Sequence, residues 1–468
     1  MSPSIPTIFI IFGATGDLME RKIVPSLFYL YSIGRLPKMF HVIGFARKEM
    51  SDESFQACIR EWVQKFIVTP EEEAKLEGFL KLFRYHQGDF GDESRYQSLS
   101  QELGRIDGKW QVCANKLYHL AVPPVWYEAI AENLEKAGLH LGCGEDGVWT
   151  RIMIEKPFGR DLKTARQVQV CFSKRFDEKQ MYRIDHYLGK GMIQDILAFR
   201  FSNTLFGGSW DNGEIDRIHI QHFETVPVGA RGSFYESVGA LRDMGQSHLL
   251  SMLAFLTMDH PIKMNAESIR LKREEILSSI MEVQDFQQDT MRSQYEGYRA
   301  EKDVAKDSKV ETYFKIHLEL DHPKWKGVPM ILEHGKALGN SNKKITVTFK
   351  RPENCLMCSP LSNQGGDSIV FSWDPHESIT IHFLSKKAGL DYELEEKEFY
   401  FSFREGQDRM EVVEGYSKLI VDAIAGDQTF FLSQEEIEAS WKVIDPIEEA
   451  WMRDEVPLEH YVQGDTLS

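Results

Sequence analysis

The sequence predicts an α/β part followed by an α+β part. Strand-like stretches alternate with helical ones over roughly the first 180 residues, which is typical of a doubly wound parallel sheet. Beyond them, short stretches of alternating apolar and polar residues recur, as in a large, mainly antiparallel sheet with one covered face. A chain of 468 residues is also too long for one ordinary core. We therefore expect two domains, residues 1–180 and 181–468.

The first predicted strand, residues 8–12, ends at a glycine turn and leads into an amphipathic helix. In a Rossmann-like fold such a turn lets the backbone approach a pyrophosphate, and the helix N-terminus offers unsatisfied N–H groups. Ile11 occupies the place of the first expected glycine, so a tight turn without a ligand is an open alternative. The candidate cofactor-binding residues are Gly13, Ala14, Thr15, Gly16, Asp17 and Leu18.

The second predicted strand, residues 41–45, is followed by Arg47. An acid near this strand end serves NAD, whereas a cation accommodates the 2′-phosphate of NADP. Arg47 therefore favours NADP, with an ordinary surface cation as the alternative. Further strands are predicted at residues 117–122 and 151–154, and the second of them runs into the motif EKPFG. Ligands of doubly wound sheets lie at the carboxyl ends of the strands, which is where these segments fall.

The residue pattern changes in the second part of the chain. No internal repeat or low-complexity linker is evident. Alternating apolar and polar residues predict strands at residues 215–223, 314–320, 345–349, 369–373, 379–383 and 399–403.

The charge of the chain excludes whole classes of partner. Lys and Arg number 55 against 72 Asp and Glu, for a net charge of −17, so the surface should repel nucleic acid and anionic membranes. An anionic substrate must then be bound by a local basic pocket. The longest apolar runs are too short to span a bilayer and no secretory signal opens the chain, so we expect a cytoplasmic protein.

Cysteine usage points to the same compartment. Six cysteines spread over the chain do not form a disulfide framework, which fits a reducing environment. Cys355 and Cys358 have metal-ligand spacing, but no second pair or histidine follows at a suitable distance. We interpret that spacing as coincidence and expect no metal site.

The octapeptide RIDHYLGK, residues 183–190, concentrates an acid, an imidazole, a phenol and two cations. Its polar positions suit neither a helix nor a strand, so a site or a solvated loop are both open. Downstream, His248 opens an apolar stretch that must be a buried helix. A histidine there is more often a satisfied core residue, but Asp185 as a partner makes a catalytic role competitive.

Taken together, these motifs resemble the glucose-6-phosphate dehydrogenase family over nearly the entire chain. Its core motifs RIDHYLGK and EKPFG are specific. The matching segments, in order, are residues 13–18 with Lys22, 155–159, 183–190, 242–243 with Gln246 and His248, 325–329 with 335–336, and 426–427 with 445–446.

The resemblance implies an enzyme that oxidises glucose 6-phosphate to 6-phosphogluconolactone and reduces NADP, as a homodimer or homotetramer built on the large sheet. It implies that His248 is the general base, that Asp185 is its carboxylate partner, and that Lys22 stands between coenzyme and substrate. Lys156 and Pro157 would adjoin both ligands. The remaining substrate-binding set would be His186, Tyr187 and Lys190 on the phosphate, with Glu224, Asp243 and Lys336 on the sugar hydroxyls.

The chain departs from the family at several positions. Ser247 stands where the family usually has Asn, Gly191 replaces a Glu, and Glu20 puts an anion near the expected pyrophosphate. The family's Trp-Asn pair is split by Asp211. None of these removes a residue with an implied chemical role. Two alternatives therefore stay open: a dehydrogenase of another aldose phosphate, and a non-catalytic binding relative.

Overall fold

The computed structural model describes residues 6–67, 69–144, 147–352, 366–374, 377–391, 393–402 and 415–466. The chain forms two compact units. The first contains the chain up to Gly191, residues Lys263–Arg270 and the segment that ends at Ile437. The second contains Met192–Ile262, the chain that continues from Leu271, and the segment from Glu438 onward.

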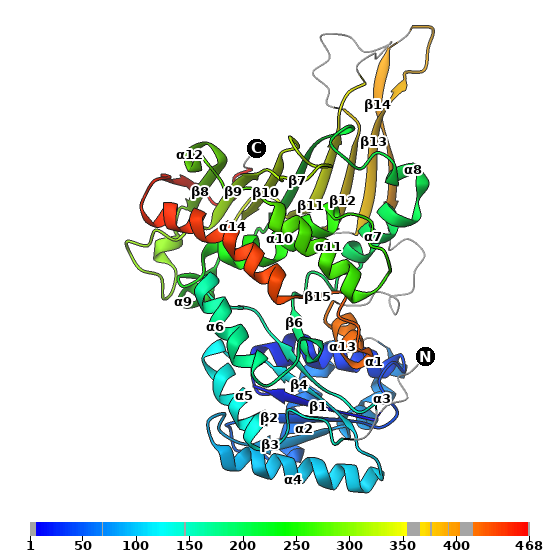
Figure 1. Ribbon diagram of the computed structural model, residues 1–468, viewed down its shortest axis with the longest axis vertical. Helices are drawn as coiled ribbons and strands as arrows, with labels where there is room; N and C mark the ends of the chain where they lie inside the picture. The colour runs from blue at the N-terminus through cyan, green and yellow to red at the C-terminus, as the bar shows by residue number, and fades with distance from the viewer. Residues whose placement is uncertain are drawn as a thin grey trace. The chain divides into compact units, whose positions relative to one another are not determined.

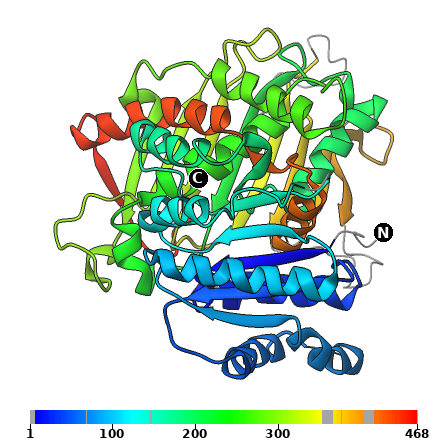
Figure 2. The same cartoon turned by 60° about the horizontal axis from the view of Figure 1, so that its bottom comes forward.

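The first unit is built on a seven-stranded sheet with the order β15-β6-β5-β4-β1-β2-β3 (Figure 1). All neighbouring strands are parallel except β15 and β6. The chain proceeds outward from β1 in one direction and from β4 in the other, so right-handed crossovers place helices on both faces, as Figure 2 shows for the blue and cyan elements. The strands are β1 (Thr7–Phe12), β2 (Phe40–Ala46), β3 (Phe83–Gln87), β4 (Asn115–Leu120), β5 (Thr150–Ile154), β6 (Met181–Ile184) and β15 (Phe431–Leu432).

Local capping signals start several helices of this unit. The Ser51 side chain accepts a hydrogen bond from Ser54 N at 3.2 Å, and Thr69 and Glu72 cap each other's backbone at the next helix. The elements are η1 (Met19–Ile23), α1 (Val24–Ser32), α2 (Asp52–Gln64), α3 (Pro70–Leu80), α4 (Glu93–Trp110), η2 (Pro124–Trp126), α5 (Tyr127–Lys136), α6 (Leu162–Ser173), η3 (Glu178–Gln180) and α13 (Gly415–Ala425).

The second unit is built on a nine-stranded sheet with the order β14-β13-β12-β11-β7-β10-β9-β8-β16. Its neighbours are antiparallel except for the pairs β7 with β10 and β8 with β16. The strands are β7 (Ile215–Phe223), β8 (Thr290–Tyr295), β9 (Tyr313–Leu318), β10 (Met330–Gly335), β11 (Asn342–Phe349), β12 (Ser368–Asp374), β13 (Ser378–Lys386), β14 (Leu394–Ser402) and β16 (Leu458–Tyr461).

Helix α10 and the part of α14 beyond Glu438 lie across one face of this sheet (Figure 1). Every residue of α10 is buried, which explains the continuous apolar stretch after His248. The helices outside the first unit's set are α7 (Gly191–Ser202), α8 (Thr204–Gly207), η4 (Gly229–Arg231), α9 (Gly232–Tyr235), η5 (Leu241–Leu249), α10 (Leu250–Thr257), α11 (Ala266–Ser279), α12 (Phe286–Asp289), η6 (Tyr298–Ala300) and α14 (Gln434–Met452).

The two sheets confirm the predicted fold class. The strands predicted in the first part are β1, β2, β4 and β5, and those predicted in the second part are β7, β9, β11, β12, β13 and β14, although residue 403 lies outside the described residues. The compact units differ from the expected division at residue 180, because β6 hydrogen-bonds to β5 and β15 adds to β6. The polar positions of the octapeptide suit neither a helix nor a strand, but its first two residues, Arg183 and Ile184, end β6.

One cysteine expectation needs correction. Cys113 and Cys143 form a disulfide, with their Cα atoms 6.5 Å apart. Cys113 precedes β4 and Cys143 precedes β5, and because these strands are parallel neighbours, the loops that enter them lie at the same edge. The sequence separation alone does not reveal this adjacency. Cys355 and Cys358 lie outside the described residues. Among the described helices, none combines the length and the apolar character needed to cross a membrane.

The backbone of Gly13 yields a test of the sheet. Its φ is +87°, and a Cβ atom added there would lie 2.2 Å from the Ala121 carbonyl oxygen. We expect Gly13→Ala to lower the free energy of unfolding by roughly 3 kcal/mol or more, because β1 and β4 must separate as well as bear the strained φ. Chemical denaturation measures this change.

Gly34 supplies the matched control, since its φ is +69° but no atom lies within 4 Å of the added Cβ. Gly34→Ala should lose only the ~1–2 kcal/mol of a left-handed alanine. Equal losses in the two variants would contradict the close approach at Gly13.

Candidate functional site

The glycine turn after β1 lies at the carboxyl edge of the first sheet. Gly13 N donates to the Phe45 carbonyl oxygen at 2.9 Å, and Gly16 N donates to the Gly13 carbonyl oxygen at 2.9 Å. Thr15, Gly16 and Asp17 are exposed, whereas Ala14 is buried. The backbone is therefore held in a tight turn with its outer side open, as a phosphate-binding turn requires.

Two acids near this turn are paired with cations. Asp17 accepts from Arg21 at 2.6 Å, and Glu20 accepts from Lys65 at 2.7 Å. The sequence suggested that the Glu20 anion could repel a pyrophosphate. In the structure its charge is paired with the Lys65 ammonium. Lys22, in the same turn of η1, is exposed.

Arg47 follows β2, the neighbour of β1. Its side chain is exposed, and its guanidinium carbon lies 6.0 Å from the Phe90 ring centre and 5.9 Å from that of Trp126. β1 and β2 are parallel with Phe12 opposite Phe45, so Arg47 and the glycine turn share one edge of the sheet. This placement suits a cation that contacts the far end of a bound dinucleotide.

Lys156 follows β5 within the EKPFG motif, and the residue before it anchors the motif. Glu155 accepts a hydrogen bond from His119 Nε2 at 2.7 Å and contacts the Tyr416 hydroxyl at 3.2 Å. The Tyr127 hydroxyl donates to the Glu155 carbonyl oxygen at 2.7 Å. Burial, together with the Glu155 carboxylate, strongly raises the pKa of Tyr416, so its hydroxyl stays a proton donor. Lys156 and Pro157 thus follow a residue held from β4, α5 and α13.

The octapeptide continues from β6 as a compact turn. Asp185 is 1% exposed, and its Oδ1 accepts from Tyr187 N at 3.0 Å. The Lys190 ammonium lies 4.7 Å from the centre of the Tyr187 ring, and the His186 ring stacks on Tyr416 at 6.1 Å. His186, Tyr187 and Lys190 therefore lie together, as a cation and two further groups able to donate to an anion.

Two glycines allow α13 to pack directly against this turn. A Cβ atom on Gly189 would lie 2.4 Å from the Gly415 carbonyl oxygen, and one on Gly415 would lie 2.7 Å from the His186 carbonyl oxygen. Tyr416, the next residue of α13, is thereby brought against both the EKPFG motif and the octapeptide.

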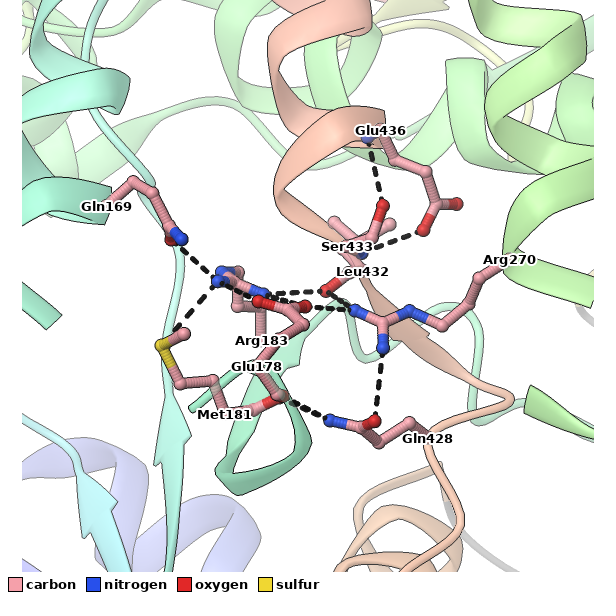
Figure 3. Close-up of polar contacts among 9 residues, drawn as sticks. All are labelled: Gln169, Glu178, Met181, Arg183, Arg270, Gln428, Leu432, Ser433 and Glu436. Atoms are coloured by element: carbon pink, nitrogen blue, oxygen red, sulfur yellow. Dashed lines mark hydrogen bonds and ion pairs between the residues drawn. The ribbon is translucent and has the colours of Figure 1, made fainter. Parts of the chain in front are cut away.

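Arg183 anchors the start of the octapeptide through the ion network in Figure 3. Its guanidinium binds both carboxylate oxygens of Glu178 at 2.8 Å, and Arg270 reaches the same carboxylate at 2.5 Å. Both arginines also donate to the Leu432 carbonyl oxygen, and Gln428 accepts from Arg270 at 3.1 Å. Burial alone would raise the pKa of Glu178, but the two guanidiniums outweigh it and lower that pKa.

A second group of predicted residues gathers in the second unit. Glu224 follows β7 and Lys336 follows β10, and these parallel neighbours bring the two side chains into an ion pair. Burial would raise the pKa of Glu224, but the Lys336 ammonium and the other basic groups nearby together outweigh it and lower that pKa. Asp243 and His248 lie in η5, with His248 2% exposed. The cluster holds a buried cation, two acids and an imidazole, groups that can bind hydroxyls and accept a proton.

Two histidines of this unit were missed by the sequence predictions. His222 and His334 stand opposite each other on β7 and β10, with their Nδ1 atoms 3.1 Å apart. His334 Nδ1 is also 2.6 Å from the His222 carbonyl oxygen, so it carries the proton and donates. Burial, followed by the Lys336 charge, lowers the pKa of His334 to about 4. Both rings are buried, and each lies two residues before a member of the Glu224 and Lys336 ion pair. A charged imidazole there would be repelled by the Lys336 ammonium.

Sequence signals for the missed residues were weak. His222 alternates with its neighbours as an ordinary strand residue, and Tyr416 is a single aromatic residue in an apolar helix. Glu155 alone of these residues lies within a recognised motif, but it had no assigned role. The contacts of all three depend on pairing between distant strands and on the packing of α13, and a single sequence does not reveal either.

Two protein-family models match this chain, one in its N-terminal part and one in its C-terminal part. The family model described as the NAD binding domain of glucose-6-phosphate dehydrogenase matches residues 10–195, and the model of its C-terminal domain matches residues 197–466. The chain belongs to the glucose-6-phosphate dehydrogenase family. Glucose-6-phosphate 1-dehydrogenase of Chlamydia muridarum is 36% identical, with 99% of this chain and 95% of the relative covered. A relative of Arabidopsis thaliana named as cytoplasmic is 33% identical, with 97% and 88% covered.

A solved glucose-6-phosphate dehydrogenase in complex with its substrate glucose-6-phosphate has a TM-score of 0.91 to this chain. It is 29% identical, with 100% of this chain and 97% of that chain covered. The enzyme of Mycobacterium avium has a TM-score of 0.84 at 27% identity, with 98% and 95% covered. The family's two-domain architecture therefore extends over this whole chain.

Within this glucose-6-phosphate dehydrogenase fold, the His222–His334 pair predicts a specific pH dependence of stability. The folded protein keeps His334 neutral down to about pH 4, whereas an unfolded chain binds that proton near pH 6.5. The unfolded state therefore gains protons as pH falls between these values, and the free energy of unfolding decreases. Replacing His334 with Gln should reduce this decrease by up to ~1.4 kcal/mol per pH unit.

Urea unfolding near pH 7 and near pH 5 measures the effect. The exposed His460 provides the control, since His460→Gln should keep the slope of the unmodified protein. Identical slopes in all three proteins would contradict a neutral buried His334.

Proposed function

We propose that this protein oxidises the C1 hydroxyl of glucose 6-phosphate to 6-phosphogluconolactone with transfer of hydride to NADP, the first step of the pentose phosphate pathway. The observation that carries the proposal is the likeness, at TM-score 0.91, to a glucose-6-phosphate dehydrogenase with bound substrate over all of this chain. The retained Asp185, His248, Lys190 and Lys336 support the same reaction.

The residues at the first sheet's carboxyl edge fit a dinucleotide. At Gly13 the turn packs so closely against Ala121 that no side chain fits, while Thr15, Gly16 and Asp17 on the turn are exposed. The exposed Arg47 would bind the 2′-phosphate, so NADP is favoured over NAD. The nicotinamide supplies the hydride acceptor. Gly13, Ala14, Thr15, Gly16, Asp17 and Leu18 would hold the pyrophosphate region, with Lys156 and Pro157 beside the nicotinamide.

In the proposed mechanism, His248 removes the proton from the C1 hydroxyl. Hydride leaves C1 readily only as the hydroxyl loses its proton, and a positioned base typically contributes about 10²–10⁴-fold. Asp185 would orient the imidazole and stabilise the imidazolium that forms. The buried position of each residue in its own unit supports this, because low solvent access strengthens such a charge interaction. Lys22 would stand between coenzyme and substrate.

The substrate would be held at both ends. His186, Tyr187 and Lys190 would bind the phosphate, and the Lys190 ammonium already lies over the Tyr187 ring. Glu224, Asp243 and Lys336 would bind the sugar hydroxyls, with Lys156 near the reacting end. Because the protein carries a net charge of −17, these lysines supply the local positive potential that a sugar phosphate needs. Binding the remote phosphate places C1 against the nicotinamide and so contributes to turnover.

We further propose a cytoplasmic homodimer or homotetramer assembled through the large sheet. The Arabidopsis thaliana relative named as cytoplasmic supports the location. The exposed Phe399, Tyr400 and Phe401 on β14, the edge strand of the nine-stranded sheet, support the assembly, since exposed aromatic residues on an edge favour association.

The general-base role predicts that His248→Asn abolishes turnover but keeps binding. We expect kcat for NADPH formation from glucose 6-phosphate to fall by ~10²–10⁴-fold, with the Kd for glucose 6-phosphate changed by less than about threefold. Absorbance at 340 nm and titration calorimetry give the two values. His460→Asn should leave both unchanged, and near-normal turnover in His248→Asn would remove the base assignment.

The coenzyme assignment predicts a selective effect at Arg47. We expect Arg47→Ala to raise KM for NADP by ~10-fold or more and to change KM for NAD by less than about twofold, because only NADP has the 2′-phosphate. The neighbouring exposed Lys48 gives the control, Lys48→Ala. A similar rise with both coenzymes in Arg47→Ala would contradict the assignment.

A further inference from the structure

The backbone around Lys336 is held by a segment that is distant in the sequence. Tyr461, the last residue of β16, lies 125 residues after Lys336, and its hydroxyl donates to the Lys336 carbonyl oxygen at 2.7 Å. The same hydroxyl lies 3.0 Å from Thr312 Oγ1, and Lys336 N donates to the Thr312 carbonyl oxygen at 3.0 Å. Tyr461 is buried and has no role in the proposed reaction.

Two backbone hydrogen bonds extend this contact along the chain. Gly464 N donates to the Ala337 carbonyl oxygen at 2.8 Å, and Gly339 N donates to the Asp465 carbonyl oxygen at 2.9 Å. The two backbones approach closely, since a Cβ atom on Gly339 would lie 2.4 Å from the Gly464 carbonyl oxygen. Residues 461–465 therefore bind the backbone that follows β10 at three successive places.

The conformation of Ala337 needs such support. Its φ is +53°, in the left-handed region that is unfavourable for a residue with a Cβ atom. Ala337 is buried and follows Lys336 directly, so the backbone turns sharply just after the lysine. Strained conformations of this kind persist where the surrounding contacts fix them. The 461–465 segment supplies contacts of this kind, through the carbonyl oxygens of Lys336 and Ala337.

The position of this backbone decides where the Lys336 ammonium lies. The side chain is 3% exposed, forms the ion pair with Glu224, and has its ammonium 5.5 Å from the centre of the Tyr235 ring. Leu338 N also donates to the Glu224 carbonyl oxygen at 3.0 Å. A shift of residues 336–338 would therefore move the ammonium relative to Glu224 as well as break a backbone contact.

We propose that the 461–465 segment positions Lys336 for the sugar phosphate, with Tyr461 as its main positioning residue. The inference rests on the proposed function, in which Lys336 binds sugar hydroxyls. Tyr461 acts through the Lys336 backbone and not on the substrate itself. Loss of its hydroxyl should therefore weaken binding of the sugar phosphate and spare the coenzyme, whose proposed residues belong to the other unit.

Steady-state kinetics of Tyr461→Phe tests this role, because phenylalanine keeps the ring and removes only the hydroxyl. We expect KM for glucose 6-phosphate to rise by about three- to tenfold, as for the loss of one hydrogen bond, with kcat and KM for NADP changed by less than about twofold. Tyr298→Phe is the matched control, since the Tyr298 ring is also buried but its hydroxyl donates to Glu236 at 2.7 Å. It should keep KM for glucose 6-phosphate within about twofold.

A double-variant comparison separates positioning from a general effect on stability. If Tyr461 acts through Lys336, Tyr461→Phe should have little further effect on kcat/KM for glucose 6-phosphate once Lys336→Met is present. Equal effects of Tyr461→Phe with and without Lys336→Met would overturn the proposal, because a purely structural role affects both proteins alike.

Hydrogen exchange followed by mass spectrometry tests the contact without any substrate. Gly339→Ala should displace the 461–465 segment, because the added Cβ atom would meet Gly464. We expect the amides of residues 336–339 to exchange faster by about threefold or more in Gly339→Ala and in Tyr461→Phe. Gly208→Ala is the control and should leave this exchange unchanged, since the φ of Gly208 is −79° and no atom lies within 4 Å of its added Cβ.

The two measurements fail for different reasons. Unchanged exchange in the variants would overturn the positioning by the 461–465 segment, whatever the substrate. If the unmodified protein does not oxidise glucose 6-phosphate, the proposed function fails, and the exchange data still decide whether this segment holds Lys336. If Gly339→Ala does not fold, Tyr461→Phe carries the exchange test alone.

Discussion

The half-buried Glu155 carboxylate is the contact on which the first unit's candidate site depends. It joins His119 on β4 to Tyr416 on α13, while its own carbonyl oxygen accepts from Tyr127 on α5. Lys156 follows directly, and the Tyr416 ring stacks on His186. One carboxylate therefore fixes the end of β5 and brings a helix more than two hundred residues away against the octapeptide. Removing its partners would leave a half-buried charge without hydrogen bonds, which costs free energy because water cannot fully replace them.

In the second unit, by contrast, two neutral histidines lie next to an ion pair. His222 and His334 stay uncharged beside the Lys336 and Glu224 ion pair. Because both imidazoles are neutral, the Lys336 ammonium faces no competing cation from this pair. The large sheet thus both positions the Glu224 and Lys336 ion pair and sets its electrostatics.

Much of the fold was readable from the sequence because the signals were local. Residues 8–12 form a continuous apolar run since β1 is buried along its whole length. The clustering of His186, Tyr187 and Lys190 was also predictable, because eight adjacent residues cannot lie far apart. Strands β3, β6, β8, β10, β15 and β16 were missed. The pairing of Cys113 with Cys143 was missed as well, since strand neighbours are set by sheet order. The boundary at residue 180 misplaced β6 for the same reason.

The sequence by itself determined the fold class, the family and the identity of the candidate reacting groups, because these depend on residue type and short spacing. Tertiary structure decided which groups support them. Glu155 meets Tyr416, Arg183 meets Arg270 through Glu178, and His222 meets His334 only because strands and helices far apart in the chain pack together. The physical reason is that local periodicity specifies which face of an element is buried, while its partner is selected by the packing of the whole core.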